Sequence, residues 1–393
     1  MATERPLIVY IDKIMNSTPP PAPGSHLQTV SEREQKLLAP YATFSSGSKG
    51  RKQAEPDHPY RGPFQRDRDR IVHSSAYRRL SGKMQVFTGN MGDYHRTRLT
   101  HTHEVASIAR TMGRALRLNE DLVEALALFH DIGHPPFGHA GEDALNLCLQ
   151  NDGGFSHNQY ALTIAEELEI RDQPHAGLNL SLEVLEGQAT RVDKDAIAEP
   201  PSLEAQVVEA ADSITYDAHD ADDAVKLGLV TLDELADLPL VQHCLQRIGA
   251  HTSQLDPDVL RRSIVHELID CQVSNVLHAA EQFLQETPGA NRQSPAMKAF
   301  RIEPVEQLAQ QKQELEEFLR SRVYRHPRLL ETRDTAQKQL QVMFRGYLAA
   351  PELLPPRFRQ RAQHVGLPRS VGDYLAGMTD RYCDQQFSQF FAG

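Results

Sequence analysis

The residues best suited to chemistry in this chain stand at the end of an apolar run that covers residues 125–129. There His130 and Asp131 are adjacent, and His134 and His139 follow shortly after them. Imidazole nitrogens and a carboxylate oxygen are donors that suit a borderline or hard divalent cation. Burying such groups without partners costs about 2 to 7 kcal/mol each, and a bound metal or a hydrogen-bond network removes that cost. The pattern therefore predicts a metal site inside a core.

A simpler explanation of the His130-Asp131 pair is a helix end, where the helix dipole and exposed carbonyls favour histidines. The segment 133–136 argues for more than that, because its glycine and two prolines end the helix directly after the pair. His134 would then lie on a turn and His139 at the start of the next helix. From those places both imidazoles can converge on one pocket.

Helices are the elements that must position these residues. Helical spacing of apolar residues dominates from residue 67 onward, and strand alternation is rare. Asn119 caps one predicted helix, and Pro200 and Pro201 open another. The predicted helices cover residues 105–116, 121–129, 178–185, 203–225, 259–284 and 305–323. The sequence therefore predicts an all-α fold.

Composition limits the class of protein. The chain has 393 residues with 40% hydrophobic content, which is typical of soluble globular proteins, and its net charge of −11 disfavours a surface devoted to nucleic acid. No run of 18 apolar residues occurs, and the amino terminus lacks the apolar core of a signal peptide. We expect no membrane partner and a cytoplasmic location. Scattered cysteines without CxxC spacing fit a reducing compartment. They are Cys148, Cys244, Cys271 and Cys383.

The first sixty residues differ from the rest of the chain. Proline, glycine and serine punctuate residues 19–25 and 45–52, on either side of a short helical pattern at 31–38. Residues 1–60 are therefore predicted to form a flexible arm with one short helix.

Further segments add polar groups to the predicted site. His101 and His103 are two residues apart on a predicted helix and point to different faces, so only one of them can join a metal. Asp212, Tyr216 and Asp220 fall at i, i+4 and i+8, which is one stripe of a helix. Small apolar residues around this stripe favour packing rather than solvent. A basic segment at 78–85, which contains a glycine, is suited to hold phosphates, and residues 155–159 form a further polar segment.

These segments together resemble the HD-domain deoxynucleoside triphosphate triphosphohydrolases, and within them the bacterial deoxyguanosine triphosphatase-like proteins. The resemblance runs from about residue 31 to the end of the chain. It implies an all-α HD-domain core at 61–240, additional C-terminal helices at 241–393 packed on that core, and a homo-oligomer, often a hexamer. The motifs, in the family's order, are Phe64–Ile71, Tyr77–Leu80, Arg98–His101, His130–His139, Phe155–His157, Ala211–Tyr216 and Asp373–Asp380.

The resemblance also implies roles for individual residues. The family's ligands of a divalent metal, Mg²⁺, Mn²⁺ or another transition metal, fall on His101, His130, Asp131 and Asp212. The implied catalytic residues are His139, Glu142 and His157. In the implied substrate contacts, Arg98, Lys83 and Arg79 face the phosphates, Gln85 contacts sugar or base, Tyr216 walls off a ribose 2′-hydroxyl and Asp220 accepts from the 3′-hydroxyl.

The implied activity is metal-dependent hydrolysis of dGTP or several deoxynucleoside triphosphates at the α-phosphate, which yields a deoxynucleoside and inorganic triphosphate. One alternative is another HD phosphohydrolase, acting on a monophosphate, a cyclic nucleotide or an alarmone with the same metal ligands. The other is a non-catalytic binder of nucleotides or single-stranded nucleic acid. That alternative rests on a basic stripe at Arg61, Arg66, Arg68, Arg70, Arg78, Arg79 and Lys83.

Overall fold

The structure is a computed structural model that describes residues 27–85, 96–170, 176–192, 200–249 and 255–391. Within these ranges the regular structure is helical, and strand-like pairing is limited to two isolated bridges, Arg51 with Ser181 and Met84 with Thr97. The predicted all-α class is confirmed. Among the helices of the described ranges, none combines the length and the apolar character needed to span a membrane.

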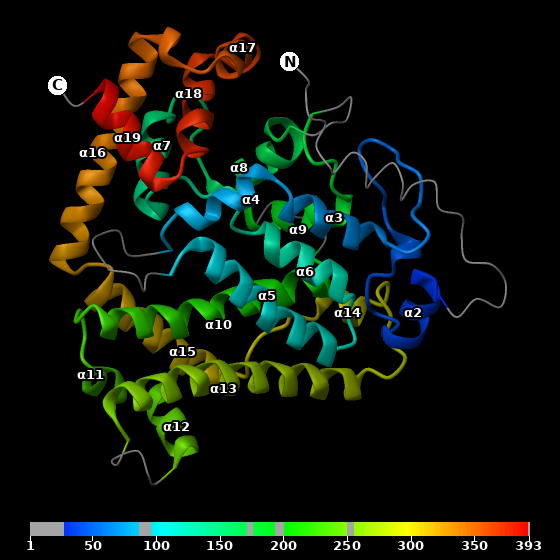
Figure 1. The fold of residues 1–393 in the computed structure, drawn as a ribbon. Helices are drawn as coiled ribbons and strands as arrows, with labels where there is room; N and C mark the ends of the chain where they lie inside the picture. Colours follow the sequence, from blue (N-terminus) through cyan, green and yellow to red (C-terminus); the bar gives the residue numbers. More distant parts are fainter. Residues whose placement is uncertain (1–26, 86–95, 171–175, 193–199, 250–254, 392–393) are drawn as a thin grey trace.

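Four helices form the centre of the molecule: α3 (Pro63–Val72), α5 (Arg98–Ala115), α6 (Glu120–Phe129) and α10 (Leu203–Lys226). α5 packs against both α6 and α10, and α3 packs against α6 (Figure 1). Apolar side chains at helical spacing, such as Val105 and Ala109 of α5 and Leu122 and Leu126 of α6, are buried between them. This arrangement places the end of α6 beside the middle of α10.

The long helix α10 joins two apolar cores. Ala211 and Ile214 belong to the larger core around α5 and α6, whereas Ala218 and Ala221 belong to a second core. Small side chains along α10 let neighbouring helices approach closely on both sides. The second core is covered by α11 (Leu232–Ala236), α12 (Pro239–Ile248), the first part of α13 (Pro257–Glu286), α15 (Glu306–Phe318) and the π-helical turn Leu319–Val323.

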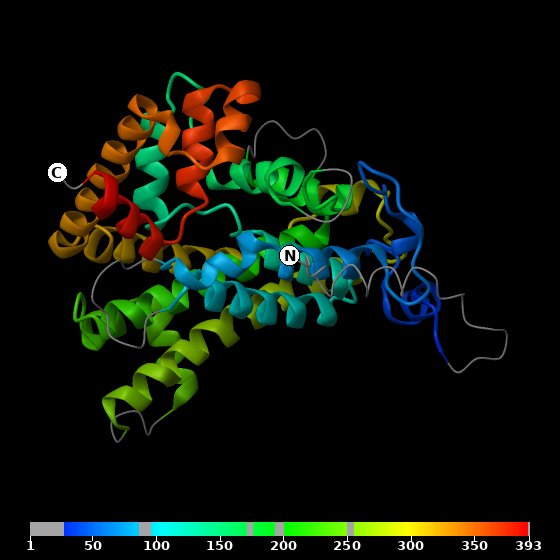
Figure 2. The same ribbon diagram turned by 45° about the horizontal axis from the view of Figure 1, so that its top comes forward.

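A third group of helices gathers at one end of the molecule, as both views show (Figures 1 and 2). α16 packs along α7, and α18 contacts both of them. The C-terminal helices therefore pack on the part of the chain that carries the candidate site, while the predicted division at residue 240 stays a prediction. The helices of this group are α7 (Gly138–Cys148), α16 (Pro327–Ala349), α17 (Pro356–Val365), α18 (Leu367–Ala376) and α19 (Asp380–Phe390).

Most helix ends follow the sequence signals, but two predicted starts are wrong. The helix predicted over 105–116 begins earlier, since α5 starts at Arg98 after the Thr97 cap. The Asn119 side chain caps α6 by accepting from the backbone N–H of Leu122. The helix predicted over 178–185 is wrong in its first half, because α9 (Leu182–Val192) begins only at Leu182. Gly177 and Asn179 just before it have φ values of 80° and 51°, and the left-handed conformation interrupts a right-handed helix.

The described part of the predicted N-terminal arm is bonded to the core. Its short helix is α2 (Val30–Leu37), close to the predicted 31–38. Further along, Thr43 donates from its backbone N–H and its hydroxyl to the Glu204 carboxylate, and Arg51 forms a buried ion pair with Asp67. The proline-rich segment 19–25 lies outside the described residues.

Candidate active site

The four predicted metal ligands converge from three helices. His101 belongs to α5, His130 and Asp131 follow the end of α6, and Asp212 lies in the middle of α10. Nε2 of His101 is 3.1 Å from Oδ1 of Asp212, and Nε2 of His130 is 3.5 Å from Oδ1 of Asp131 and 3.6 Å from Oδ1 of Asp212. Donor atoms of His101, His130 and Asp131 all lie within 4.8 Å of one another. The structure therefore assembles a compact nitrogen and oxygen donor set.

The hydrogen bonding of His130 fits a metal ligand. Its Nδ1 lies 2.6 Å from the carbonyl oxygen of Ala127, so Nδ1 carries the proton and Nε2 presents a lone pair to the cluster. The residue is only 1% exposed, and Nε2 has no hydrogen-bond partner among the described residues. A buried unpaired nitrogen is costly, and a divalent cation held by this donor set would remove the cost.

Each carboxylate of this cluster is also bound by an arginine. Nη1 of Arg98 donates to Oδ2 of Asp131 at 2.9 Å, and Nη2 of Arg191 donates to Oδ2 of Asp212 at 2.5 Å. Burial by itself would raise the pKa of both acids. The neighbouring His134 and His130 imidazoles and the Arg98 guanidinium hold the pKa of Asp131 well below the usual range, and His130 and Arg191 do the same for Asp212.

Arg98 was predicted to contact phosphate, and its role stays a prediction. Its guanidinium is almost completely buried, with Nη1 on Asp131 and Nη2 on the carbonyl oxygen of Gln85. Arg191 was not predicted, because it stands alone at the end of α9 and belongs to none of the motifs. Only its place beside α10 reveals the contact with Asp212.

The three residues predicted to be catalytic form a second cluster beside the metal ligands. Oε1 of Glu142 accepts from Nδ1 of His157 at 2.8 Å, and Oε2 accepts from Nδ1 of His139 at 3.2 Å. These bonds hold the pKa of Glu142 well below its usual range, although burial opposes this. The side chain of His139 is 57% exposed, whereas that of His157 is largely buried. One carboxylate therefore orients two imidazoles.

His134 connects the two clusters. Its ring stacks on that of His157 with centroids 3.8 Å apart, and its Nδ1 lies 3.0 Å from Oδ1 of Asp131. Nε2 of His134 is buried and makes no hydrogen bond within the described ranges. The spacing between His130 and His139 indicated that His134 belongs to the pocket, but it gave the residue no role.

The pair predicted to contact the sugar, Tyr216 and Asp220, lies further along α10. The phenol of Tyr324 donates to Oδ2 of Asp220, and its ring centroid is 5.9 Å from that of Tyr216. Burial raises the pKa of Asp220 to about 7. Tyr324 follows the π-helical turn after α15, and the sequence offered no signal that this distant segment reaches α10.

The residues of the segment 78–85 that were predicted to contact the substrate are buried or half-buried. Nζ of Lys83 is buried and donates to the carbonyl oxygens of His134 and Ala376, and burial lowers its pKa to about 7. Lys83 therefore ties the loop after Asp131 to α18. Arg79 is half-buried, and Gln85 is buried, with no hydrogen-bond partner for its Oε1 in the part of the chain that the structure describes. Their phosphate and sugar contacts stay predictions.

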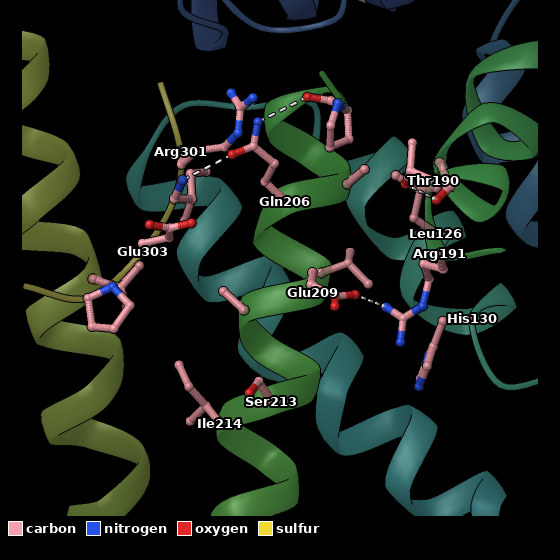
Figure 3. Close-up of a pocket in the computed structure, with 18 of the residues that line it drawn as sticks. Leu126, His130, Thr190, Arg191, Gln206, Glu209, Ser213, Ile214, Arg301 and Glu303 are labelled. Carbon is pink, nitrogen blue, oxygen red and sulfur yellow. Dashed lines mark hydrogen bonds and ion pairs between the residues drawn. The ribbon is translucent and has the colours of Figure 1, made fainter. Parts of the chain in front are cut away.

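A cavity of about 520 Å³ adjoins the metal ligands between α9, α10, α13 and the segment before α15 (Figure 3). His130 and Arg191 stand in its wall, and Gln206, Glu209 and Ser213 line it from α10. Neither the sugar pair nor the histidines bound to Glu142 contribute to its lining. The cavity therefore lies on a different side of the metal ligands from the sugar pair and the Glu142 cluster.

Two family models match this chain. One, described as HD domain, matches residues 98–217, and the other, described as Phosphohydrolase-associated domain, matches residues 302–389. The first range contains all four predicted metal ligands and the Glu142 cluster. The second contains Tyr324, the helices α16 to α18 and most of α19.

Relatives in three bacteria extend the match over most of the chain. Each is named deoxyguanosinetriphosphate triphosphohydrolase-like protein. The protein of Ralstonia pickettii is 41% identical over 90% of this chain and 95% of its own. The Nitrosomonas europaea protein is 38% identical over 90% of this chain and 98% of its own, and that of a Caulobacter species is 41% identical over 90% and 96%. Such identity over nearly the whole length shows that the chain belongs to the HD-domain phosphohydrolase family of deoxyguanosinetriphosphate triphosphohydrolase-like proteins.

Proposed function

We propose that this protein hydrolyses deoxynucleoside triphosphates, dGTP or several of them, at the α-phosphate, with release of a deoxynucleoside and inorganic triphosphate. The observation that carries the proposal is the contact between the two clusters. His134 touches Asp131 of the metal ligands and stacks on His157 of the Glu142 cluster. A phosphate group between them would meet a cation site and two oriented imidazoles together. The names of the relatives add the substrate class.

The residues proposed to hold the metal are His101, His130, Asp131 and Asp212. A divalent cation there, with Mg²⁺ or Mn²⁺ as the first candidates, would lower the pKa of a bound water molecule and polarise a phosphate oxygen. Two neutral imidazoles and two carboxylates balance its charge. With the cation bound, Arg98 and Arg191 would add two positive charges, of which Glu209 offsets one. The remaining positive charge would favour an anionic substrate although the chain as a whole is acidic.

The Glu142 cluster is proposed to move protons. Because Glu142 accepts from Nδ1 of both His139 and His157, the Nε2 atoms of both rings point away from it. As water attacks the α-phosphate and the bond to the 5′-oxygen breaks, a protonated imidazole fixed in this way can donate its proton to the 5′-oxygen, which leaves with the deoxynucleoside. His139 is the more exposed of the two and is the first candidate for that donor.

Tyr216 and Asp220 are proposed to select the deoxyribose. The ring of Tyr216 would block a 2′-hydroxyl, and Asp220 would accept a hydrogen bond from the 3′-hydroxyl. Tyr324 already donates to Asp220, so it fixes the carboxylate that the sugar would meet.

The first experiment is a product assay. The metal-free protein is incubated with each deoxynucleoside triphosphate, singly and mixed, with Mg²⁺ or Mn²⁺, and the products are separated by chromatography. We expect deoxynucleoside and inorganic triphosphate in equal amounts. Activity only in the mixture would add an activating nucleotide to the proposal. Pyrophosphate as product, or four intact nucleotides with metal bound, would overturn it and turn attention to monophosphates, cyclic nucleotides and alarmones.

His130→Ala provides the matched test of metal dependence, because the side chain is buried and its Nε2 makes no hydrogen bond to another described residue. We expect activity and bound metal to be lost together. His103→Ala is the control, since His103 lies on the same α5 as His101 but is exposed and contacts only the Tyr77 hydroxyl among the described polar groups. An active His130→Ala variant without metal would contradict the proposal.

The basic stripe gives little support to the alternative that the protein is a non-catalytic binder of single-stranded nucleic acid. Arg61 and Arg68 pair with Asp69, Arg66 and Arg70 pair with Glu55, and Lys83 is buried. Four arginines of the stripe therefore pair with acids, and Lys83 donates to carbonyl oxygens. Arg78 is exposed and donates to the carbonyl oxygen of His73. The homo-oligomer stays a prediction, which light scattering after size-exclusion chromatography would test.

A further inference from the structure

Asp212 directs its two carboxylate oxygens at different partners. Oδ1 lies 3.1 Å from Nε2 of His101 and 3.6 Å from Nε2 of His130, on the side of the candidate metal ligands. Oδ2 accepts from Nη2 of Arg191 at 2.5 Å. Only one oxygen of this carboxylate is therefore left for a cation.

Asp131 shows the same division. Its Oδ1 faces two imidazoles, 3.5 Å from Nε2 of His130 and 3.0 Å from Nδ1 of His134, whereas its Oδ2 accepts from Nη1 of Arg98 at 2.9 Å. The two arginines come from separate elements, the start of α5 and the end of α9. The repetition of one contact on both acids indicates that the second oxygen is withheld in each case by a rigid, permanently charged group.

A second acid fixes Arg191 in place. Nη1 of Arg191 lies 2.7 Å from Oε2 of Glu209, which stands on α10 one turn before Asp212. Arg191 lies between Glu209 and His130 at the wall of the cavity (Figure 3). Its side chain is 18% exposed, so water competes little with these bonds. The planar guanidinium spans both acids of α10 and holds the Asp212 carboxylate in one orientation.

We propose that Arg191 is a positioning residue that restricts Asp212 to ligation through one oxygen, so that the site prefers a small octahedral cation to a larger one. The inference rests on the proposed metal dependence. Mg²⁺ and Mn²⁺ favour octahedral sites, whereas Ca²⁺ takes up to eight oxygens at longer distances and often binds both oxygens of one carboxylate. Arg191 withholds the second oxygen that Ca²⁺ would use.

The test is a competition between two divalent ions on the metal-free full-length protein. Mn²⁺ binding is measured by electron paramagnetic resonance, and Ca²⁺ is added to displace it, for the wild type and for Arg191→Met. Both ions carry the same charge, so the loss of the arginine charge cancels in the ratio of their dissociation constants. Freeing Oδ2 should shift this ratio towards Ca²⁺ by about tenfold or more.

Two further variants separate positioning from other effects. Glu209→Gln weakens one of the two contacts that hold Arg191 but leaves its bond to Asp212, so its ratio should lie between those of the wild type and Arg191→Met. Arg191→Lys keeps the charge but not the planar fork, and it should shift the ratio in the same direction as Arg191→Met. It also supplies the answer if circular dichroism shows that Arg191→Met is unfolded.

An unchanged ratio in the folded Arg191 variants, with Mn²⁺ bound, would overturn the inference. This readout does not depend on turnover, so it stands apart from the product assay. If the wild type releases no triphosphate but the ratio still shifts in the Arg191 variants, the proposed reaction is refuted and the role of Arg191 is kept. A wild-type protein that binds no Mn²⁺ would overturn both.

Discussion

The imidazole rings of His134 and His157 are stacked, with their centroids 3.8 Å apart and their planes 25° from parallel. His134 lies on the turn after the candidate metal ligands, and His157 begins α8 (His157–Thr163). The stack therefore fixes the distance between the metal ligands and the Glu142 cluster. Any change that separates the two rings should weaken the chemistry while leaving each cluster intact.

Gly133 is the residue that permits this close approach. A Cβ atom at this position would lie 2.0 Å from the carbonyl oxygen of His157 and 2.5 Å from the backbone nitrogen of Ala161. Both obstacles are backbone, so they cannot rotate away. We expect Gly133→Ala to lower the free energy of unfolding by about 1 to 3 kcal/mol, measured by urea denaturation, and to reduce turnover of the folded fraction. Gly47→Ala is the control, because a Cβ there meets nothing within 4 Å. Equal stability of the two variants would contradict the packing argument.

Glu142→Gln tests the proton-transfer cluster. A glutamine keeps the size of the side chain but cannot accept through both of its terminal atoms, so one of the bonds to His139 and His157 is lost together with the charge. We expect the turnover number to fall by about 10² to 10⁴ with metal content unchanged. Steady-state kinetics and metal analysis of the same sample provide the measurement. The neighbour Asp143 pairs with the exposed Arg333, and Asp143→Asn should retain full turnover. Wild-type turnover in Glu142→Gln would rule out its role.

Tyr216→Ala tests sugar selection. The ring lies on the same stripe of α10 as Asp212 and packs beside Tyr324. Without it, space opens for a 2′-hydroxyl, and the ratio of kcat/KM for GTP to that for dGTP should rise by roughly tenfold. Tyr216→Phe keeps the ring and should keep the ratio. If removing the ring leaves the ratio unchanged, another group rejects ribonucleotides.

Asp217→Asn should change how stability depends on pH. Asp217 is fully buried beside Lys312, and burial raises its pKa from 3.8 to about 7 against the opposing effect of Lys312. Between about pH 4 and pH 7 the folded carboxyl keeps a proton that the unfolded chain has released. The folded state then binds more protons, and the free energy of unfolding falls as pH rises through this window.

Asparagine cannot titrate, so the difference between variant and wild type isolates this effect. Relative to the wild type, Asp217→Asn should gain at least about 1 kcal/mol of stability between pH 4 and pH 7, with no further change above pH 7. Urea denaturation at a series of pH values measures the difference. The charged neighbours Lys312 and Glu316 are common to both proteins. A difference that does not vary with pH would show that Asp217 is ionised throughout.

Much of the site could be predicted from local sequence. Apolar periodicity and the Asn119 cap predicted α6, and the glycine and prolines of 133–136 predicted its end, because helix formation and termination depend on nearby residues. The i, i+4, i+8 spacing placed Asp212, Tyr216 and Asp220 on one stripe of α10. Where two left-handed residues interrupt the chain at 177 and 179, periodicity alone gave the wrong helix start.

Only the tertiary structure decided which charges meet. Arg191 and Tyr324 reach Asp212 and Asp220 from segments with no motif, because the packing of α9 and of the turn after α15 on α10 brings them there. It also turned Lys83 and Arg98 inward onto a carbonyl and a carboxylate. Local sequence fixes helix faces and ends through short-range sterics and hydrogen bonds. Contacts between distant side chains depend on how those faces pack, and here that packing determines which carboxylate oxygens remain for a cation.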